Sequence, residues 1–444
     1  MKLLNIYFNN FRRYEKALLR FHPEFTVLIG ENGKGKTTVL DAIAVMLCTY
    51  FHGSGIKTGQ SVIKKDDSRL VMNEKGGQIF LEPQRDVFLV ANAVVQGNPI
   101  DWRREVGDRG GKAKKIIDIG RSDRSSITSE APDLPLLLYY GSGRLWDIHR
   151  KVETEKPGSQ LDAYRFCLDP KSDQKAFEKW FKKLTISALQ KGKESPALHV
   201  VKNAVLKCIP DAEDFFHDTE QDQILITLKT EGLIPFNNLS DGYRNMVAMV
   251  ADIAQRASRL NPHFENEAAK KTKGIVLIDE IDLHLHPKWQ RHVVRDLQNA
   301  FPALQFIATT HSPFIIQSLD PGEVIDLNQN AIPEIVSMAP DGVAVPGPAD
   351  SYSNRSIEDI TEEVMGVDLP QRSNRYQQMY DVATHYYKLL QKAETANVSE
   401  KADLKAQLDE LSAPFSDNVA YYAFLQMERI AAGLGKTNQK KEDQ

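Results

Sequence analysis

The chain has 444 residues, of which 41% are hydrophobic and 26% are charged. These fractions are ordinary for a folded protein, so they exclude global disorder. The formal net charge of -4 excludes a uniformly basic nucleic-acid binder, and it leaves room only for a local basic patch.

The sequence also limits the compartment. No apolar run is long enough to span a membrane, and the N-terminus lacks the apolar core of a secretory signal. The three cysteines, Cys48, Cys167 and Cys208, lie far apart, which excludes a disulfide framework and a cysteine zinc site. We therefore expect a cytoplasmic protein with no membrane partner.

The N-terminal part predicts strands around a glycine-rich loop. Residues 1–30 alternate and then run apolar, which predicts two strands, the second fully buried. The loop at 30–37 leads into an apolar-periodic helix over 39–51. Residues 54–77 are polar and predict a surface loop, whereas 78–100 predict antiparallel strands.

The middle of the chain predicts a helical insertion between strands. Residues 101–124 are charged and contain glycine, which indicates a mobile surface stretch, and 135–143 predict a buried strand. Residues 157–210 are mostly helical in pattern, and 223–229 predict a strand. We place the helical insertion at about 145–215.

Helices and buried strands alternate in the next part. The pattern predicts a helix over 243–258, a strand over 274–280, a helix over 286–301, and strands over 304–311 and 323–328. This alternation indicates an α/β fold.

The end of the chain has a different composition. Residues 338–353 are rich in Pro, Gly and Asp and predict a linker, and 355–435 are charged and helical in pattern. We therefore expect two domains, an α/β head over 1–340 and a helical domain over 355–435.

The loop at 30–37 fits the phosphate-binding pattern G-x-x-x-x-G-K-[ST]. Glycines let successive backbone N–H groups turn toward phosphates, and the following helix adds its positive end. Lys36 would reach the β- and γ-phosphates, and the Thr37 hydroxyl would bind Mg²⁺. The expected nucleotide contacts are Asn32, Gly33, Lys34, Gly35, Lys36, Thr37 and Thr38.

Two acids follow the apolar strand that begins at residue 274. Ligands bind where parallel strands end. There Asp279 would complete the Mg²⁺ shell, and Glu280 would polarise a water attacking the γ-phosphate. A simple charge pair at a helix start is the alternative.

Two further motifs have both a structural and a functional interpretation. Ser240, Asp241 and Gly242 open a helix, where Ser240 is a plausible N-cap and the N-terminus is also an anion site. His311 ends the strand over 304–311, and a lone histidine there is commonly structural.

The order of these motifs resembles the ABC/SMC/RecF class of ATPases, with LSDGY in place of its LSGGQ signature. The segments NFRRY, GENGKGKTT, YYGSGR, LSDGYRNM, IDEIDLHLHPKWQ and TTHSPF resemble, more narrowly, the small AAA_21 ATPases of bacterial defence islands. Septu-type (PtuA-like) ATPases are the nearest, some of them encoded with retrons. The resemblance covers residues 1 to about 325. It implies an ABC/SMC-type head with a mixed sheet, and ATP and Mg²⁺ as cofactors.

The resemblance also implies residue roles. In this class the signature reaches the γ-phosphate bound to the opposite subunit, so Ser240–Gly242 would close a homodimer over two ATP molecules. A higher oligomer is the alternative. His311 stands where the class places its switch histidine and Glu280 where it places the catalytic base. Arg12 and Arg13 stand where relatives place an arginine near the nucleotide, and a surface pair is the plainer reading.

Three departures from the class pattern stand out. No heptads separate the phosphate loop from the signature, which excludes a coiled-coil rod. No Q-loop glutamine is recognisable near YYGSGR. Asp241 replaces a usual glycine, which would weaken binding of the opposite γ-phosphate and leaves open slow turnover or a structurally held nucleotide.

The resemblance implies a sensor or regulatory ATPase that controls a partner in antiviral defence. The implied partners are an HNH-type nuclease and, in retron-encoded forms, a reverse transcriptase with its DNA. A RecF-like DNA-repair or DNA-clamping ATPase is the main alternative, and a transporter subunit is a weaker one. The chain itself shows no complete nuclease pattern.

Two segments carry additional hypotheses. Residues 101–124 hold eight bases and five acids, which suits either a solvated loop or a phosphate-backbone contact. Asp282, His284 and His286 stand at the dimer-contact loop of the class, and metal binding by the two histidines is the alternative.

Overall fold

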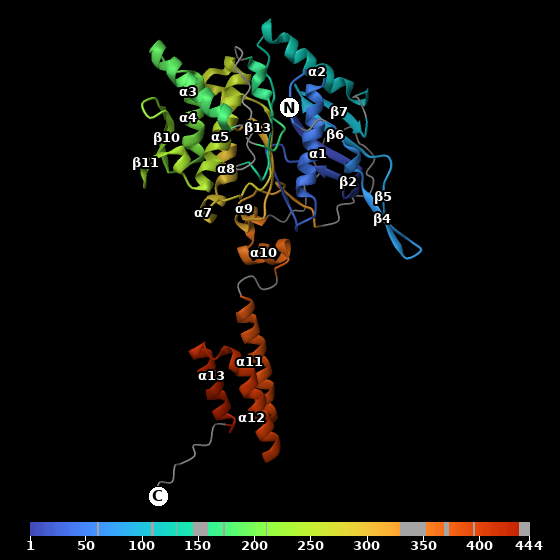
Figure 1. The fold of residues 1–444 in the computed structure, drawn as a ribbon, viewed down its shortest axis with the longest axis vertical. Coiled ribbons are helices and arrows are strands. Elements are labelled where there is room, and N and C mark those ends of the chain that lie inside the picture. The colour runs from blue at the N-terminus through green and yellow to red at the C-terminus, as the bar shows by residue number, and fades with distance from the viewer. Residues whose placement is uncertain are drawn as a thin grey trace. The chain divides into compact units, whose positions relative to one another are not determined.

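The fold is taken from a computed structural model, which divides the chain into two compact units (Figure 1). We call Met1–Gly366 the head and Val367–Gln444 the C-terminal unit. The residues that the structure describes are 1–59, 62–107, 111–129, 131–144, 159–171, 174–209, 211–328, 352–367, 373–393 and 396–434.

A five-stranded parallel sheet forms the centre of the head. Its strand order is β14-β3-β13-β12-β8, and every neighbouring pair is parallel. All residues of β3, β12 and β13 are buried, as their continuous apolar runs predict. The strands are β3 (Phe25–Ile29), β8 (Leu136–Tyr140), β12 (Gly274–Ile278), β13 (Leu304–Thr309) and β14 (Val324–Asp326). The expected buried strands are confirmed.

Antiparallel pairing occurs in separate sheets. One has the order β2-β1-β6-β7 and another the order β11-β10-β9. The expected mixture of parallel and antiparallel strands is therefore divided among sheets. The strands are β1 (Lys2–Phe11), β2 (Tyr14–Arg20), β6 (Phe88–Val95), β7 (Asn98–Glu105), β9 (Ala212–Asp218), β10 (Gln223–Leu228) and β11 (Gly232–Pro235).

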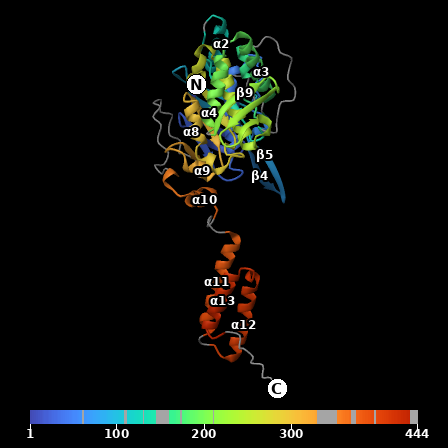
Figure 2. The same cartoon turned by 90° about the vertical axis from the view of Figure 1, so that its left-hand side faces the viewer.

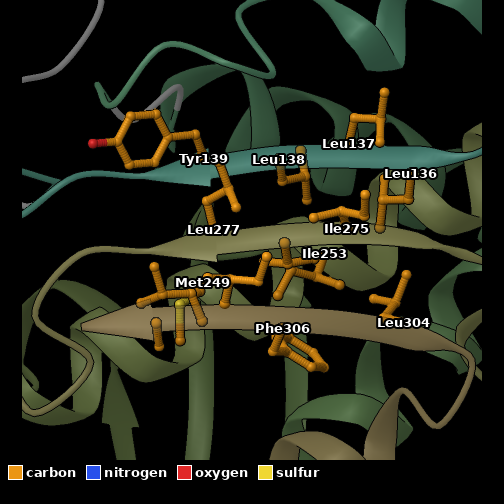
Figure 3. Packing of buried hydrophobic residues seen from close by; sticks show 14 of the residues in the cluster. Leu136, Leu137, Leu138, Tyr139, Met249, Ile253, Ile275, Leu277, Leu304 and Phe306 are labelled. Atoms are coloured by element: carbon orange, nitrogen blue, oxygen red, sulfur yellow. The ribbon is translucent and has the colours of Figure 1, made fainter. Parts of the chain in front are cut away.

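Helices cover the parallel sheet. Helix α1 (Lys36–Cys48) contacts β12 and β13, and α5 (Asp241–Leu260) contacts β8. Met249 and Ile253 of α5 lie beside side chains of the sheet, including Leu277 (Figure 3). Figure 1 shows α3, α4, α5 and α8 grouped on one side of the head. The other helices of the head are α2 (Lys114–Ser125), α3 (Gln174–Lys191), α4 (Pro196–Cys208), α6 (Ala268–Lys271), α7 (Pro287–Gln290), α8 (Val293–Ala300), α9 (Pro313–Gln317) and α10 (Ile357–Met365).

The helical insertion is present as α3 and α4, whereas residues 145–158 lie outside the described part of the chain. The expected linker over 338–353 also lies almost wholly outside it. All three cysteines are buried in the head. No helix among the described residues combines the length and apolarity needed to cross a membrane.

Three local predictions were wrong. The expected loop over 54–77 contains β4 (Leu70–Lys75), which pairs with β5 (Gln78–Pro83) in an isolated hairpin. Of the stretch 101–124, the described residues 101–107 and 111–124 include the end of β7 and α2, because Trp102, Ile116 and Ile117 bury their side chains. The helix over 286–301 is broken between α7 and α8.

The β4–β5 hairpin stands out from the head (Figure 2). Leu70 pairs with Pro83 and Met72 with Leu81, so these four side chains share one face. Leu70, Met72 and Leu81 are 56%, 64% and 61% exposed. The hairpin therefore carries an apolar face that nothing else in the described head covers.

The boundary between the units falls later than expected. Helix α10 belongs to the head, because Ile360 and Val364 are buried in the head's main hydrophobic cluster. The C-terminal unit contains α11 (Asn374–Ala393), α12 (Val398–Ser412) and α13 (Val419–Ala431). These helices enclose their own small core of Tyr386, Leu389, Leu390, Ala393, Leu404, Leu408, Leu425 and Leu434. The C-terminal unit therefore has a small hydrophobic core of its own.

Candidate active site

The phosphate loop follows β3 directly and ends at the first residue of α1. Gly30, Gly33 and Gly35 have φ values of 142°, 80° and 92°, which side chains other than glycine rarely tolerate. A Cβ atom on Gly35 would also lie 2.6 Å from Cδ of Arg13. The glycines are therefore required by the path of the loop, which turns its backbone toward the start of α1.

Lys36 is held inside this loop. Its side chain is buried, and Nζ donates to the carbonyl oxygens of Gly30 at 2.7 Å and Glu31 at 3.2 Å. Burial lowers the pKa of Lys36, and the nearby carboxylates of Asp279 and Glu280 oppose that shift. The ammonium thus lies where a phosphate-binding lysine is required.

The two arginines before the loop differ in their contacts. Arg12 bonds to Asp41 at 2.6 Å and to Asp67 at 2.8 Å, so it joins β1, α1 and the segment before β4. Arg13 is exposed and donates to the carbonyl oxygen of Gly33 in the loop. The geometry favours Arg13 over Arg12 as the arginine beside a nucleotide.

The carboxyl ends of β12 and β13 meet the phosphate loop. The Thr37 hydroxyl donates to Oδ2 of Asp279 at 3.0 Å, and the Thr309 hydroxyl donates to Oδ1 at 2.7 Å. The backbone N–H of Glu280 donates to Oγ1 of Thr309 at 2.7 Å. Thr37, Asp279 and Glu280 are therefore brought together as expected, and Thr309 orients both acids.

The oxygen ligands present suit Mg²⁺. The described residues contain no group of three or more His, Cys, Asp or Glu side chains able to hold a metal ion. Magnesium usually binds through one or two carboxylates together with substrate phosphates and water. Thr37 and Asp279 fit that mode, whereas a metal site at His284 and His286 gains no support. The His286 ring nitrogen instead accepts the N–H of Lys288.

The signature residues lie at the start of α5. Ser240 is the N-cap residue, but its hydroxyl forms no capping bond. Asp241 bonds to Arg244 at 2.7 Å, which offsets part of its charge. A Cβ atom on Gly242 would lie 2.4 Å from the carbonyl oxygen of His284. Within the described residues, no hydrogen bond joins 240–242 to the phosphate loop of the same chain.

His311 follows β13 beside the acidic segment. Its backbone N–H donates to Oδ1 of Asp282 at 3.3 Å, and the Thr310 hydroxyl donates to the same oxygen at 2.6 Å. His311 is exposed. Asp282 therefore fixes the backbone of His311 at the end of β13.

Two site residues had no role expected from the sequence. Where the class pattern expects a glutamine, the chain after β8 carries Arg144, which donates to the carbonyl oxygens of Asp279 at 2.7 Å and Glu280 at 3.0 Å. Its Nε donates to Oδ1 of Asn245 at 2.6 Å. Arg144 and Asn245 lie in YYGSGR and LSDGYRNM, two segments that carry the family resemblance, but the resemblance implied no role for either residue.

Part of the basic charge of the stretch 101–124 is engaged in contacts within the head. Arg104 is buried and donates to Thr49 Oγ1 at 3.0 Å, and Arg124 donates to the Tyr50 carbonyl at 2.8 Å. Arg103 and Lys112 pair with Glu105, both at 3.1 Å. Arg109 lies outside the described residues. A phosphate-backbone contact here would rest mainly on Lys114 and Lys115, which are exposed.

Comparison with known proteins agrees with these motifs. The AAA_21 family, described as "AAA domain, putative AbiEii toxin, Type IV TA system", matches residues 25–317. The "Retron Vc95 probable ATPase" of Vibrio cholerae serotype O1 biovar El Tor is 26% identical and covers 74% of each chain. The "Septu protein PtuA" of Bacillus thuringiensis is 24% identical and covers 79% of this chain and 80% of its own.

Among solved structures, an SMC head bound to the C-terminal winged-helix domain of ScpA aligns at a TM-score of 0.42 and 14% identity, covering 73% of this chain and 94% of that one. The family match includes the phosphate loop, both acids and the histidine. The expected kinship is therefore confirmed: the chain belongs to the AAA_21 family.

Proposed function

We propose that this chain binds ATP with Mg²⁺ at the phosphate loop and hydrolyses it, as the regulatory subunit of an antiviral defence complex. One observation carries the hydrolysis: Thr37, Asp279, Thr309 and Glu280 form a connected set at the carboxyl edge of the parallel sheet. A bound Mg²⁺ ion would neutralise phosphate charge beside Thr37 and Asp279.

The residues of the site would have separate roles in ATP binding and hydrolysis. Lys36 and the backbone N–H groups of the loop bind the β- and γ-phosphates. Glu280 accepts a proton from the attacking water. The His311 ring would sense the γ-phosphate beside it.

Purified protein tests hydrolysis directly. We expect phosphate release from ATP that requires Mg²⁺ and stops on adding EDTA, as in other phosphoryl-transfer sites. ATP binding without any release would instead favour a structurally held nucleotide, which the unusual Asp241 would suit.

A head-to-tail homodimer would complete the site, because residues 240–242 form no hydrogen bond with the phosphate loop of their own chain among the described residues. The Ser240 hydroxyl is left without a capping role, and the start of α5 offers backbone N–H groups to an anion. We propose that these groups bind the γ-phosphate held by the opposite subunit. Arg13 of the subunit whose phosphate loop holds that nucleotide would lie beside it.

Replacing Ser240 with arginine is expected to block this dimer while leaving ATP binding intact. The longer cation would fill the space needed by the opposite γ-phosphate. Light scattering with ATP and Mg²⁺ measures the mass, and Ser129→Arg at another exposed serine is the control. If Ser240→Arg dimerises like the unmodified protein, the signature does not form the interface.

The defence role follows from the relatives. Retron and Septu ATPases match about three quarters of this chain. Such extended similarity favours defence over a RecF-like repair function. We infer that the effector is a separate HNH-type nuclease, with a reverse transcriptase and its DNA in a retron setting. Copurification with the products of neighbouring genes, followed by mass spectrometry, tests the partner.

The C-terminal unit is the candidate docking or oligomerising module. Ending the chain at Gly366 keeps α10 and the whole head core, so we expect ATP affinity to stay unchanged. The amount of effector that copurifies, or the native mass of the assembly, should decrease. If the shortened chain keeps both its partner and its assembly, the module has neither role. If it precipitates, the unit stabilises the head instead.

A further inference from the structure

We propose that Arg144 and Asn245 are a positioning pair that ties helix α5 to the backbone of Asp279 and Glu280. The orientation of the Glu280 carboxylate would then depend on the position of the signature residues 240–242 at the start of α5. This inference rests on the proposed hydrolysis at Glu280, and it adds a route by which the second subunit controls that residue.

Arg144 holds the backbone of the two acids, Asp279 and Glu280. Only 5% of the residue is exposed. Its guanidinium donates to the carbonyl oxygens of Gly141 at 3.1 Å, Asp279 at 2.7 Å and Glu280 at 3.0 Å. Together with its bond to Asn245, these are its hydrogen bonds within the described residues, and none of them reaches a carboxylate. The Arg144 side chain thus holds the backbone of both acids and forms no hydrogen bond with their carboxylates.

Asn245, a residue of α5, connects the Arg144 side chain to this helix. Its Oδ1 accepts from Arg144 Nε at 2.6 Å, and its Nδ2 donates to the carbonyl oxygen of Leu283 at 3.2 Å. One turn earlier, Gly242 lies so close to the His284 carbonyl that a Cβ atom would clash. The start of α5 therefore contacts the segment 279–284 at several points, and a shift of one displaces the other.

The backbone at Glu280 requires such support. Glu280 has a φ of 49°, a left-handed conformation that residues other than glycine rarely adopt. Strained conformations persist where surrounding contacts hold them, and they concentrate at functional sites. Thr309 holds the N–H of Glu280 and Arg144 holds its carbonyl oxygen. The two bonds fix the peptide units on both sides of the side chain.

A merely stabilising role fits the chemistry poorly. Burial lowers the pKa of Arg144 to about 10, with the carboxylates of Asp279 and Glu280 opposing. Burying a cation among carbonyls costs stability that an apolar side chain would not lose. The planar fork bonds several carbonyls at once, which a lysine cannot do. We therefore expect that an arginine is required at position 144 for the geometry of its hydrogen bonds, and not for the stability of the fold.

The test compares phosphate release by Arg144→Ala, Arg144→Lys, Asn245→Ala and the double alanine variant. We expect kcat to fall about 10- to 100-fold, since small misplacement of a catalytic group has effects of that size. ATP affinity and the ATP-dependent dimer should stay within about threefold, because neither residue contacts the phosphate loop. The double variant should be no slower than the worse single one, as for residues acting in series. Arg144→Lys should not restore kcat.

Asn261→Ala is the matched control. Asn261 is a buried asparagine at the other end of α5, bonded to the backbone of Leu134 at 2.8 and 3.0 Å. Its loss should lower Tm without changing kcat. Wild-type kcat in Asn245→Ala, or multiplying effects in the double variant, would overturn the proposal. If Arg144→Ala does not fold, Asn245→Ala decides, because it leaves the arginine in place.

Hydrogen exchange separates this proposal from the proposed function. If the unmodified protein releases no phosphate, hydrolysis at Glu280 is disproved, whereas the link to α5 stays measurable. Peptides covering 279–285 should exchange faster in Asn245→Ala than in the unmodified protein or in Asn261→Ala. Equal exchange in all three would overturn the link itself.

Discussion

Replacing Lys36 with alanine is expected to abolish measurable ATP binding. The substitution removes the cation that would face the phosphates and also the bonds to the carbonyl oxygens of Gly30 and Glu31 that shape the loop. Truncating one partner of a buried charge pair costs about 2–5 kcal/mol. That loss corresponds to about a 30- to 5,000-fold weaker affinity. Isothermal titration with ATP and Mg²⁺ measures the effect.

Lys16→Ala is the control for this experiment, because Lys16 is an exposed lysine on β2. It should bind ATP like the unmodified protein. Unchanged affinity in Lys36→Ala would mean that residues 30–37 are not the nucleotide site, and the proposed function would fail with it.

Replacing Glu280 with glutamine is expected to keep ATP binding and to slow turnover about 100- to 1,000-fold, the usual contribution of a general base. The amide keeps the size of the side chain but no longer accepts the proton. Because ATP then persists between the subunits, the ATP-bound dimer should also last longer. Phosphate release and light scattering measure the two effects.

Glu267→Gln, which affects a surface ion pair with Lys270, serves as the control and should leave turnover unchanged. Normal phosphate release in Glu280→Gln would remove Glu280 from the catalytic role. Asp279, the other acid in the site, would then be the residue to test next.

The sequence predicted the features that depend on local patterns. Continuous apolar runs identified the parallel strands, because burial on both faces requires them. Glycine spacing and the Lys-Thr pair identified the phosphate loop, and strand ends located Asp279 and Glu280 beside it. The family resemblance supplied the interpretation of Ser240 and His311, which local pattern alone leaves ambiguous.

Features that depend on distant partners were missed. Arg12 looked like Arg13 in the sequence, but Asp41 and Asp67 engage its side chain. The charges of 101–124 suggested a solvated loop, whereas the apolar side chains of Trp102, Ile116 and Ile117 in the same stretch are buried in the head. No role was predicted for Arg144, because its bonds to the backbone of 279 and 280 arise only when β8 and β12 become neighbours.

Because its cysteines are buried, the folded head reacts slowly with thiol reagents. Burial raises the pKa of the thiols of Cys48, Cys167 and Cys208, and alkylating reagents react with the thiolate. Labelling therefore requires each region to open, and its rate measures how often opening occurs. Cys48 ends the helix that begins at the phosphate loop, so a bound nucleotide should slow its labelling in proportion to occupancy. Since the chain has no cysteine beyond residue 208, such labelling follows the head without interference from the C-terminal unit.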